Sequence, residues 1–228
     1  KQEVMIGYSD SSKDAGKICA SWHQYKAQEE IVSLAKKFNI EVVFFHGRGG
    51  SAGRGGGPIQ ATLRSLPPKS VNGKIRITDQ GEVIQQKYGY EPLANYNLCS
   101  YIGAVTEATL NPPPSPKNNW RNLIEKMSDI SKSSYRKNIN QSSEFIKYFE
   151  TVTPHKALGK LSIGSRPSKR KNIDNIKSLR AIPWVFAWTQ IRLMLPAWLG
   201  SAEALRYSYI NKFRSCLLYT SDAADDRI

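Results

Sequence analysis

The sequence predicts an α/β protein, rich in helix, that is built around a parallel sheet or barrel. Two observations support this fold class. Short apolar runs alternate along the chain with longer segments of helical periodicity. In addition, the apolar run at 40–45 stops abruptly at a loop that alternates glycine with arginine. A buried strand that leads into such a loop is how parallel α/β enzymes present an anion site at their strand ends.

The elements of the first half follow from these patterns in order. Residues 4–8 form a short apolar run, which predicts a strand. The next segment places Ile18, Trp22 and Tyr25 near helical spacing and predicts a helix over about 14–38. After the strand at 40–45, we expect a short helix that has a proline in its first turn and then a short strand, at 58–66 and 74–78.

The second half is predicted to be mainly helical. Helices are expected over 81–110 with a break near Pro92, over 120–149, and over the apolar stretch near 184–199. The tryptophans of the last helix are expected to be core residues, because they recur at helical spacing. A proline run at 112–116 is predicted to be a stiff connector, and 164–175 a basic loop.

Composition limits the classes of function. The chain has 228 residues and a formal net charge of +14, which favours anionic partners such as phosphates, carboxylates, nucleic acid or an acidic membrane surface. Its three cysteines have no paired spacing, which argues against a disulfide framework or a zinc site and fits a reducing cytoplasm. The apolar stretch at 182–199 is interrupted by Gln190, Arg192 and Pro196, which favours a buried helix over a membrane span.

The loop after the second strand is the strongest functional signal. It carries His46 at its mouth and two arginines, Arg48 and Arg54, among glycines. Glycines let a backbone approach a ligand closely, and arginine offers a planar, charged fork that matches phosphate and carboxylate oxygens. A flexible linker and an RNA-binding segment are the alternative interpretations of such a loop. The hydrophobic segments on both sides of it argue against both alternatives.

Five ordered blocks carry a resemblance to a known family. They read VMIGYSDSSKDAG, FHGRGGSAGRGGGP, ITDQGEVIQQKYG, LGKLSIGSRPSKRK and SLRAIPWVFAWTQIRLMLPAWLG. In their order and spacing they resemble phosphoenolpyruvate carboxylase over nearly the whole chain. A basic RNA-binding module and a different phosphoenolpyruvate-using barrel enzyme, such as one that transfers phosphate onto a protein histidine, are the alternative functions.

The resemblance implies both a fold and a reaction. The family joins phosphoenolpyruvate to bicarbonate, with Mg²⁺ or Mn²⁺, and releases oxaloacetate and phosphate. Its fold implies that this chain forms the later part of a (β/α)8 TIM-like barrel with additional helices. The resemblance also implies a cytoplasmic homotetramer that has no nucleic-acid or membrane partner.

The family's motifs also imply roles for individual residues. Asp10 matches the metal-binding aspartate. The positions that match substrate-binding residues are Lys13, Arg48, Arg166 and Arg180. Arg54 matches an arginine that stabilises carboxyphosphate, and His46 matches a histidine near the carboxylation step.

The residues themselves leave other interpretations open. Asp10, at the end of the first predicted strand, suits a hard metal ligand, but an aspartate before two serines also forms helix N-caps and Asx turns. Lys13 is expected in the first turn of a helix, where the dipole disfavours a cation unless an anion lies nearby. A lone histidine such as His46 is more often structural than catalytic.

Both ends of the chain are expected to be artificial boundaries. It begins at Lys1, and the first family block starts almost at once. Residues 216–228 resemble the translated adapter of a sequencing library, which leaves 1–215 as a partial catalytic barrel domain. The resemblance implies that the family's main catalytic histidine and a metal-binding glutamate lie upstream of this chain. We therefore expect the isolated chain to be inactive.

Overall fold

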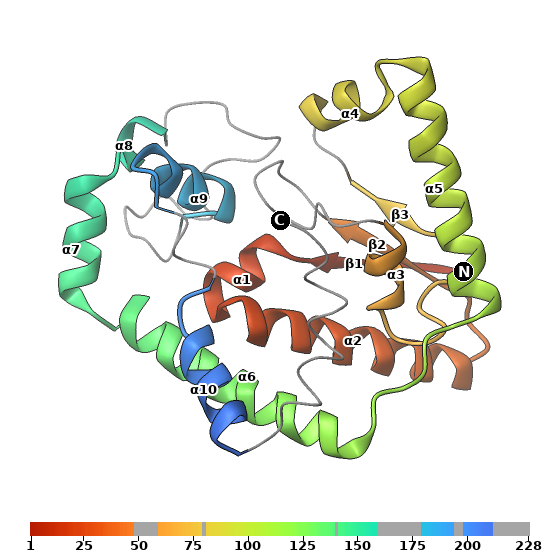
Figure 1. Ribbon diagram of the computed structural model, residues 1–228, viewed down its shortest axis with the longest axis horizontal. Coiled ribbons are helices and arrows are strands. Elements are labelled where there is room, and N and C mark those ends of the chain that lie inside the picture. The colour runs from red at the N-terminus through yellow and green to blue at the C-terminus, as the bar shows by residue number, and fades with distance from the viewer. Residues whose placement is uncertain (48–58, 79–80, 140, 159–178, 194–197, 212–228) are drawn as a thin grey trace. The chain divides into compact units, whose positions relative to one another are not determined.

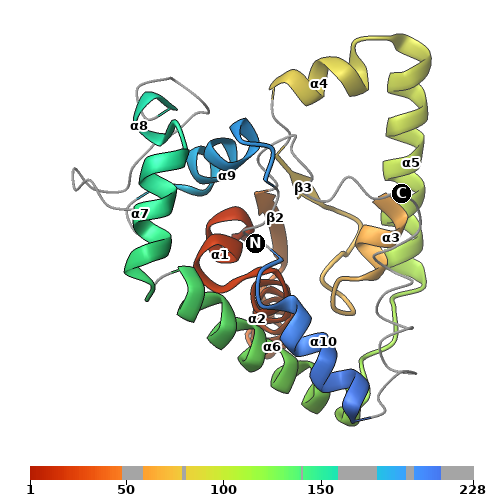
Figure 2. The same cartoon turned by 60° about the vertical axis from the view of Figure 1, so that its left-hand side comes forward.

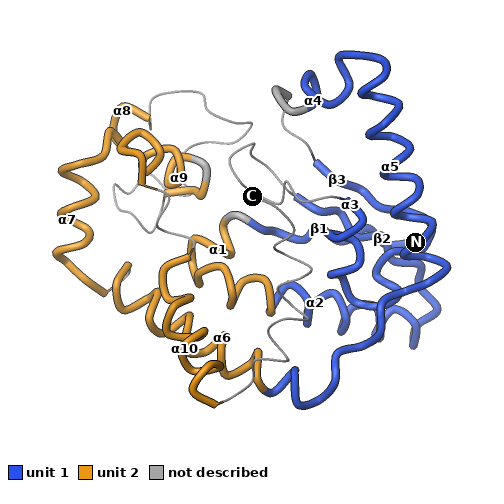
Figure 3. Tube along the Cα trace, in the orientation of Figure 1, with its two compact units in different colours: residues 1–8, 23–122, 212–228 blue, residues 9–22, 123–211 orange. Residues whose placement is uncertain are grey.

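A computed structural model describes residues 1–47, 59–78, 81–139, 141–158, 179–193 and 198–211 (Figure 1). The chain divides into two compact units (Figure 3). The described residues of unit 1 come from 1–8 and 23–122, and those of unit 2 come from 9–22 and 123–211.

Unit 1 is built on a parallel sheet in which β2 is the central strand. In the described residues the strand order is β1–β2–β3, formed by Gln2–Gly7, Val42–Gly47 and Arg76–Ile77. Both pairs are parallel, with Ile6 opposite His46 and His46 opposite Ile77. Val43 and Phe44, which point to opposite faces of β2, are both buried. The predicted α/β class with a parallel sheet is therefore confirmed, and each strand lies close to its predicted position.

Three helices are described in unit 1 besides its part of the long helices α2 and α6, which span Lys17–Lys37 and Asn118–Ile139. They are α3, α4 and α5, formed by Ile59–Arg64, Gly81–Tyr88 and Glu91–Leu110. The predicted break near Pro92 is confirmed, because Pro92 lies in the first turn of α5, where a missing N–H is tolerated. α3 lies against α5 (Figures 1 and 2). Leu63 of α3, Ala104 and Ala108 of α5, and Leu66 and Val71 from the segment after α3 form one buried cluster.

The single helix predicted over 14–38 is wrong, because the structure has two helices there. α1 spans Ser9–Ala15 and α2 spans Lys17–Lys37. Gly16 separates them with a φ of +77°, a left-handed conformation that ends a helix and that glycine adopts at low cost. A Cβ at this position would lie 3.2 Å from the ring of Tyr135, so close packing also favours glycine here.

The one helix predicted over 120–149 is also wrong. α6 spans Asn118–Ile139, and α7 follows as a separate helix over Ser143–Val152. Ser142 begins α7, because its hydroxyl accepts a hydrogen bond from the Phe145 N–H at 3.1 Å. A serine at this position offers the backbone a cap in place of a continued helix.

The last predicted helix is shorter than expected. α9 spans Ala181–Gln190 and does not reach residue 199, and Arg192 just beyond it has a φ of 58°, which a right-handed helix does not allow. Two further helices were not predicted, α8 over His155–Leu158 and α10 over Ser201–Ile210. The basic loop predicted at 164–175 lies outside the described residues. Among the residues that are described, no helix has both the length and the apolar character needed to cross a membrane.

Aromatic rings form the core of unit 2. Trp184 and Trp188 of α9 are each 1% exposed, and their rings meet edge to face with centroids 5.5 Å apart. Phe149 of α7 packs against both rings, at centroid distances of 4.8 and 5.3 Å. The prediction that these two tryptophans are core residues is confirmed. It is wrong for Trp198, which is 63% exposed.

Gly200→Ala is expected to destabilise unit 2 by at least about 2 kcal/mol. Gly200 precedes α10 with a φ of +84°, and a Cβ there would lie 2.4 Å from the carbonyl oxygen of Ser131 in α6. Alanine is unfavourable at this position for two reasons. The positive φ strains its backbone, and its Cβ would clash with the Ser131 carbonyl oxygen. The midpoint of urea unfolding, followed by pulse proteolysis, measures the loss of stability.

Gly103→Ala is the matched control for this substitution. Gly103 lies inside α5, and a Cβ there would meet nothing within 4 Å. Alanine in such a helix position is expected to stabilise the protein by about 0.5–1 kcal/mol. The packing assigned to Gly200 is wrong if both alanine variants shift the urea midpoint in the same direction.

Candidate functional site

Asp10 joins α1 to the N-terminus of α9. Its Oδ1 accepts a hydrogen bond from the Ala181 N–H at 3.0 Å, and its Oδ2 lies 3.9 Å from Nη1 of Arg180. The first N–H groups of a helix have no acceptor within the helix, and Arg180, the N-cap residue of α9, makes no side-chain cap. Asp10 therefore supplies a carboxylate where the helix dipole favours negative charge.

The position of Asp10 corrects the prediction from sequence. Asp10 does not end the first strand but lies in the first turn of α1. Asp10 does accept a hydrogen bond from the N-terminus of a helix, as the N-cap alternative proposed. The N–H belongs, however, to Ala181 of α9, which is 171 residues further along the chain, and not to the helix next to Asp10. The contact brings together two residues that the sequence assigned to the site, Asp10 and Arg180.

Lys13 lies in the last turn of α1, not in the first turn of a helix as predicted. A cation is favoured at that end of a helix, so the predicted position of Lys13 is wrong and the helix dipole no longer supports a neighbouring anion. The side chain is only 6% exposed, and Nζ lies 3.7 Å from Oδ1 of Asp14 and 6.0 Å from the centroid of the Trp184 ring. Lys13 is therefore a buried charge held by a carboxylate and an aromatic face.

A hydrogen bond from α6 fixes the backbone at Lys13. The Tyr135 hydroxyl donates to the Lys13 carbonyl at 2.6 Å. Burial raises the pKa of Tyr135, and the charge of Asp14 raises it further, so the hydroxyl keeps its proton and remains a donor. Tyr135 therefore holds the last turn of α1 in place, and with it the helix that carries Asp10 and Lys13.

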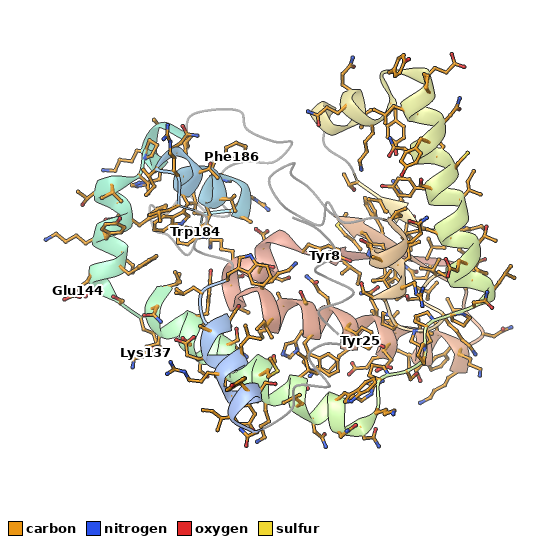
Figure 4. All side chains as sticks on the ribbon, viewed as in Figure 1. Tyr8, Tyr25, Lys137, Glu144, Trp184 and Phe186 are labelled. Atoms are coloured by element: carbon orange, nitrogen blue, oxygen red, sulfur yellow. The ribbon has the colours of Figure 1, made fainter. Side chains whose placement is uncertain are left out.

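His46 lies in unit 1, near the carboxyl end of the central strand β2. It is 1% exposed, and its Nδ1 is 2.6 Å from the hydroxyl of Tyr8, which is labelled in Figure 4. Its carbonyl accepts a hydrogen bond from the Thr78 N–H at 3.1 Å, beyond the end of β3. The carboxyl end of a parallel sheet is where α/β enzymes place polar side chains for binding and catalysis.

Sequence reasoning did not single out Tyr8. The register could have revealed it, since parallel strands with Gly7 opposite Gly47 place residue 8 just beyond the sheet, at the same edge as His46. The other two histidines, His23 and His155, match no catalytic position of the family's motifs, and they occupy ordinary positions. His23 is exposed, and the His155 ring packs against Phe149 with centroids 5.1 Å apart.

Three of the predicted site residues, Arg48, Arg54 and Arg166, lie outside the described residues. In the part of the chain that is described, no three histidine, cysteine, aspartate or glutamate side chains gather as a metal site. Asp10 nevertheless suits one position of a Mg²⁺ site. Mg²⁺ is commonly held by one or two carboxylates together with water and substrate phosphate, and the Asp10 side chain is 36% exposed and so within reach of an ion.

The fold and the candidate site together indicate a class of protein. Unit 1 has a parallel sheet with a buried histidine at the end of its central strand. Unit 2 has a carboxylate and an arginine paired at a helix N-terminus. A polar side chain at the carboxyl end of a parallel strand is typical of α/β enzymes, and a helix N-terminus favours negatively charged groups.

Comparison with known proteins identifies the family. The family model described as phosphoenolpyruvate carboxylase matches residues 1–217, and the chain belongs to that family. A protein of Marinobacter nauticus named phosphoenolpyruvate carboxylase is 55% identical over 205 residues. Proteins of the same name from Hahella chejuensis and Acinetobacter baumannii are 53% and 56% identical over 206 and 205 residues. Each alignment covers 90% of this chain and 23% of the relative, so the chain spans about a quarter of their length.

Proposed function

We propose that this chain is part of an enzyme that carboxylates phosphoenolpyruvate with bicarbonate and releases oxaloacetate and phosphate. The observation that carries the proposal is the family match over residues 1–217, together with about 55% identity to relatives named for this activity. An RNA-binding module does not account for that match, and neither does an enzyme that transfers phosphate onto a protein histidine.

The proposal extends to the fold and to the limits of the domain. The parallel strands of unit 1 belong to the later part of a (β/α)8 barrel with additional helices, as the family resemblance implies. Residues 1–215 form part of that catalytic domain, and 216–228 are a non-native, adapter-derived tail. The end of the family match at residue 217 supports this boundary. The complete enzyme is a cytoplasmic homotetramer without nucleic-acid or membrane partners.

In the proposed site, Asp10 is a ligand of Mg²⁺ or Mn²⁺. When bound, the ion supplies positive charge to the enol oxygen of phosphoenolpyruvate. Arg180 binds an anionic oxygen of the same substrate. Nη1 of Arg180 lies 3.9 Å from Oδ2 of Asp10, which is too long for a hydrogen bond. The guanidinium is therefore close to the carboxylate but does not form a bidentate pair with it, and this supports a role in binding the substrate.

The other residues are proposed to contact the substrates. Lys13 binds phosphoenolpyruvate, and its burial supports this role because a charge in a low-dielectric environment acts strongly on nearby anions. Arg48 and Arg166 bind phosphoenolpyruvate, and Arg54 stabilises carboxyphosphate. Preorganised cations of this kind lower the energy of the charge that develops as phosphate is transferred and released.

The complete enzyme, translated from the full reading frame that encodes this sequence, provides the test. We expect oxaloacetate only when phosphoenolpyruvate, bicarbonate and a divalent cation are all present, measured through NADH oxidation by malate dehydrogenase. Consumption of phosphoenolpyruvate without bicarbonate would favour another enzyme of this substrate. Salt-sensitive binding of single-stranded RNA without a metal requirement would favour the RNA-binding alternative.

The isolated 228-residue chain is expected to form no oxaloacetate in the same assay. It spans 23% of its relatives' length, so most of a complete enzyme would be missing from it. It is also expected to be poorly soluble, because α5 exposes Tyr96, Ile102 and Leu110 at 70%, 66% and 73%. Metal-dependent oxaloacetate formation by the purified chain would contradict this expectation, and the soluble fraction after centrifugation measures its second part.

A further inference from the structure

The hydrogen bond between Tyr8 and His46 ties together two strand ends of the sheet. Tyr8 directly follows β1, and His46 is the next-to-last residue of β2. The Tyr8 hydroxyl and Nδ1 of His46 are 2.6 Å apart, and the two rings are tilted by 42° with centroids 5.9 Å apart. Both residues belong to unit 1.

The backbone of His46 has little freedom in this position. Its strand is paired on both edges, to β1 through Ile6 and to β3 through Ile77. The side chain is buried beside the Phe44 ring, with centroids 6.4 Å apart. Rotation about the Cβ–Cγ bond would exchange the positions of the two ring nitrogens, and the hydrogen bond to Tyr8 favours the orientation with Nδ1 toward the phenol.

The chemistry of the two groups sets the direction of this bond. A phenol, with an ordinary pKa of about 10, is a better donor than a neutral imidazole N–H, and a bare imidazole nitrogen is a better acceptor than a phenol oxygen. A separation of 2.6 Å is also typical of an O–H donor. The Tyr8 O–H therefore donates to Nδ1, and the ring proton of His46 lies on Nε2.

We propose that Tyr8 is a positioning residue that holds His46 as the Nε2–H tautomer, so that His46 donates a hydrogen bond to a substrate oxygen and does not act as a base. The inference rests on the proposed function. Phosphoenolpyruvate, bicarbonate and carboxyphosphate all present anionic oxygens, which accept from an N–H and repel a bare nitrogen lone pair. In Tyr8→Phe, this hydrogen bond no longer favours the tautomer with the proton on Nε2.

Tyr8→Phe in the complete enzyme tests the role of Tyr8, because it removes the O–H and keeps the ring. Turnover is expected to fall about tenfold, while the KM for phosphoenolpyruvate changes by less than about twofold. Tyr96→Phe, which removes a hydroxyl from a side chain that is 70% exposed on α5, is the control and is expected to change neither constant.

His46→Gln and His46→Asn test the donor role. A glutamine amide can place an N–H near the position of Nε2, whereas asparagine is too short to do so. We expect His46→Gln to keep several times the turnover of His46→Asn. Equal loss in the two variants would overturn the donor role.

A double-mutant cycle separates positioning from simple structural support. In a His46→Gln background there is no tautomer to select, so adding Tyr8→Phe should lower turnover by less than about twofold. A further tenfold loss in that background, or no loss from Tyr8→Phe in the parent enzyme, would overturn the inference. If the parent enzyme forms no oxaloacetate at all, the proposed function fails first, and the inference fails with it.

Discussion

Asp10→Asn in the complete enzyme is expected to lower turnover by about a hundredfold or more, since a catalytic metal contributes several kcal/mol to the transition state. Asparagine keeps an oxygen that can accept the Ala181 N–H, so the contact between α1 and α9 survives. It loses the negative charge that a divalent cation requires. The substitution therefore separates the structural role of Asp10 from its proposed metal role.

The measurement is turnover as a function of Mg²⁺ concentration. Half-saturation is expected to move to a much higher concentration of Mg²⁺ in Asp10→Asn. Asp129→Asn, which removes an exposed carboxylate from α6, is the matched control and should leave the Mg²⁺ curve unchanged. Should Asp10→Asn keep near-normal turnover and an unchanged curve, Asp10 is a helix-capping residue and no more.

Arg54→Lys is expected to remove most oxaloacetate formation and leave phosphoenolpyruvate binding nearly intact. Lysine keeps the charge but lacks the planar fork that can donate to two oxyanions at once. The loss of one well-placed donor in a preorganised site typically costs on the order of a hundredfold to a thousandfold in turnover. Steady-state kinetics with phosphoenolpyruvate varied, at saturating bicarbonate and Mg²⁺, measures both constants.

Arg166→Lys is the companion to this experiment. The role proposed for Arg166 is to hold the ground-state substrate, so its replacement should raise the KM for phosphoenolpyruvate more than it lowers turnover. The contrast between the two arginines tests the chemistry proposed for the glycine-rich loop. Near-normal turnover in Arg54→Lys would make that loop a structural linker.

The strands could be predicted from the sequence because their signals are local. The apolar run that leads to His46 is short, rich in β-formers and bounded by glycine, and it became the central strand of the sheet. The break at Pro92 could be predicted for the same reason, because proline acts on the residues beside it. His46 was predicted in the loop just after this strand, whereas the structure places it inside β2, as the next-to-last residue.

The helix boundaries that failed depended on contacts or on single residues inside a helical pattern. Gly16 reads as a tolerable glycine in a long helix, yet it breaks that helix where Tyr135 packs on it. The position of Lys13 was predicted wrongly for the same reason. Lys13 was expected where the long helix begins, but it lies in the last turn of α1, which ends at Ala15. Such packing joins residues that are far apart in the sequence, and no local periodicity reports it.

The candidate site could also be predicted only where its signals are local. The types of residue expected there could be chosen from motifs, but the partner of Asp10 could not, because Ala181 is 171 residues away. Tyr8 shows the intermediate case. Once the parallel pairing of β1 with β2 is known, its place beside His46 follows from the register, but the sequence alone does not fix that register.

Tyr135 has a consequence for how this part of the chain can change during evolution. Its ring packs on Gly16, and its hydroxyl binds the Lys13 carbonyl 122 residues earlier. Any residue that replaces it must fit the same narrow contact and satisfy the same carbonyl. A change in the packing of α6 is therefore expected to displace α1 and the Asp10 carboxylate with it, so that a mutation in α6 changes both the stability of unit 2 and the position of a residue in the candidate site.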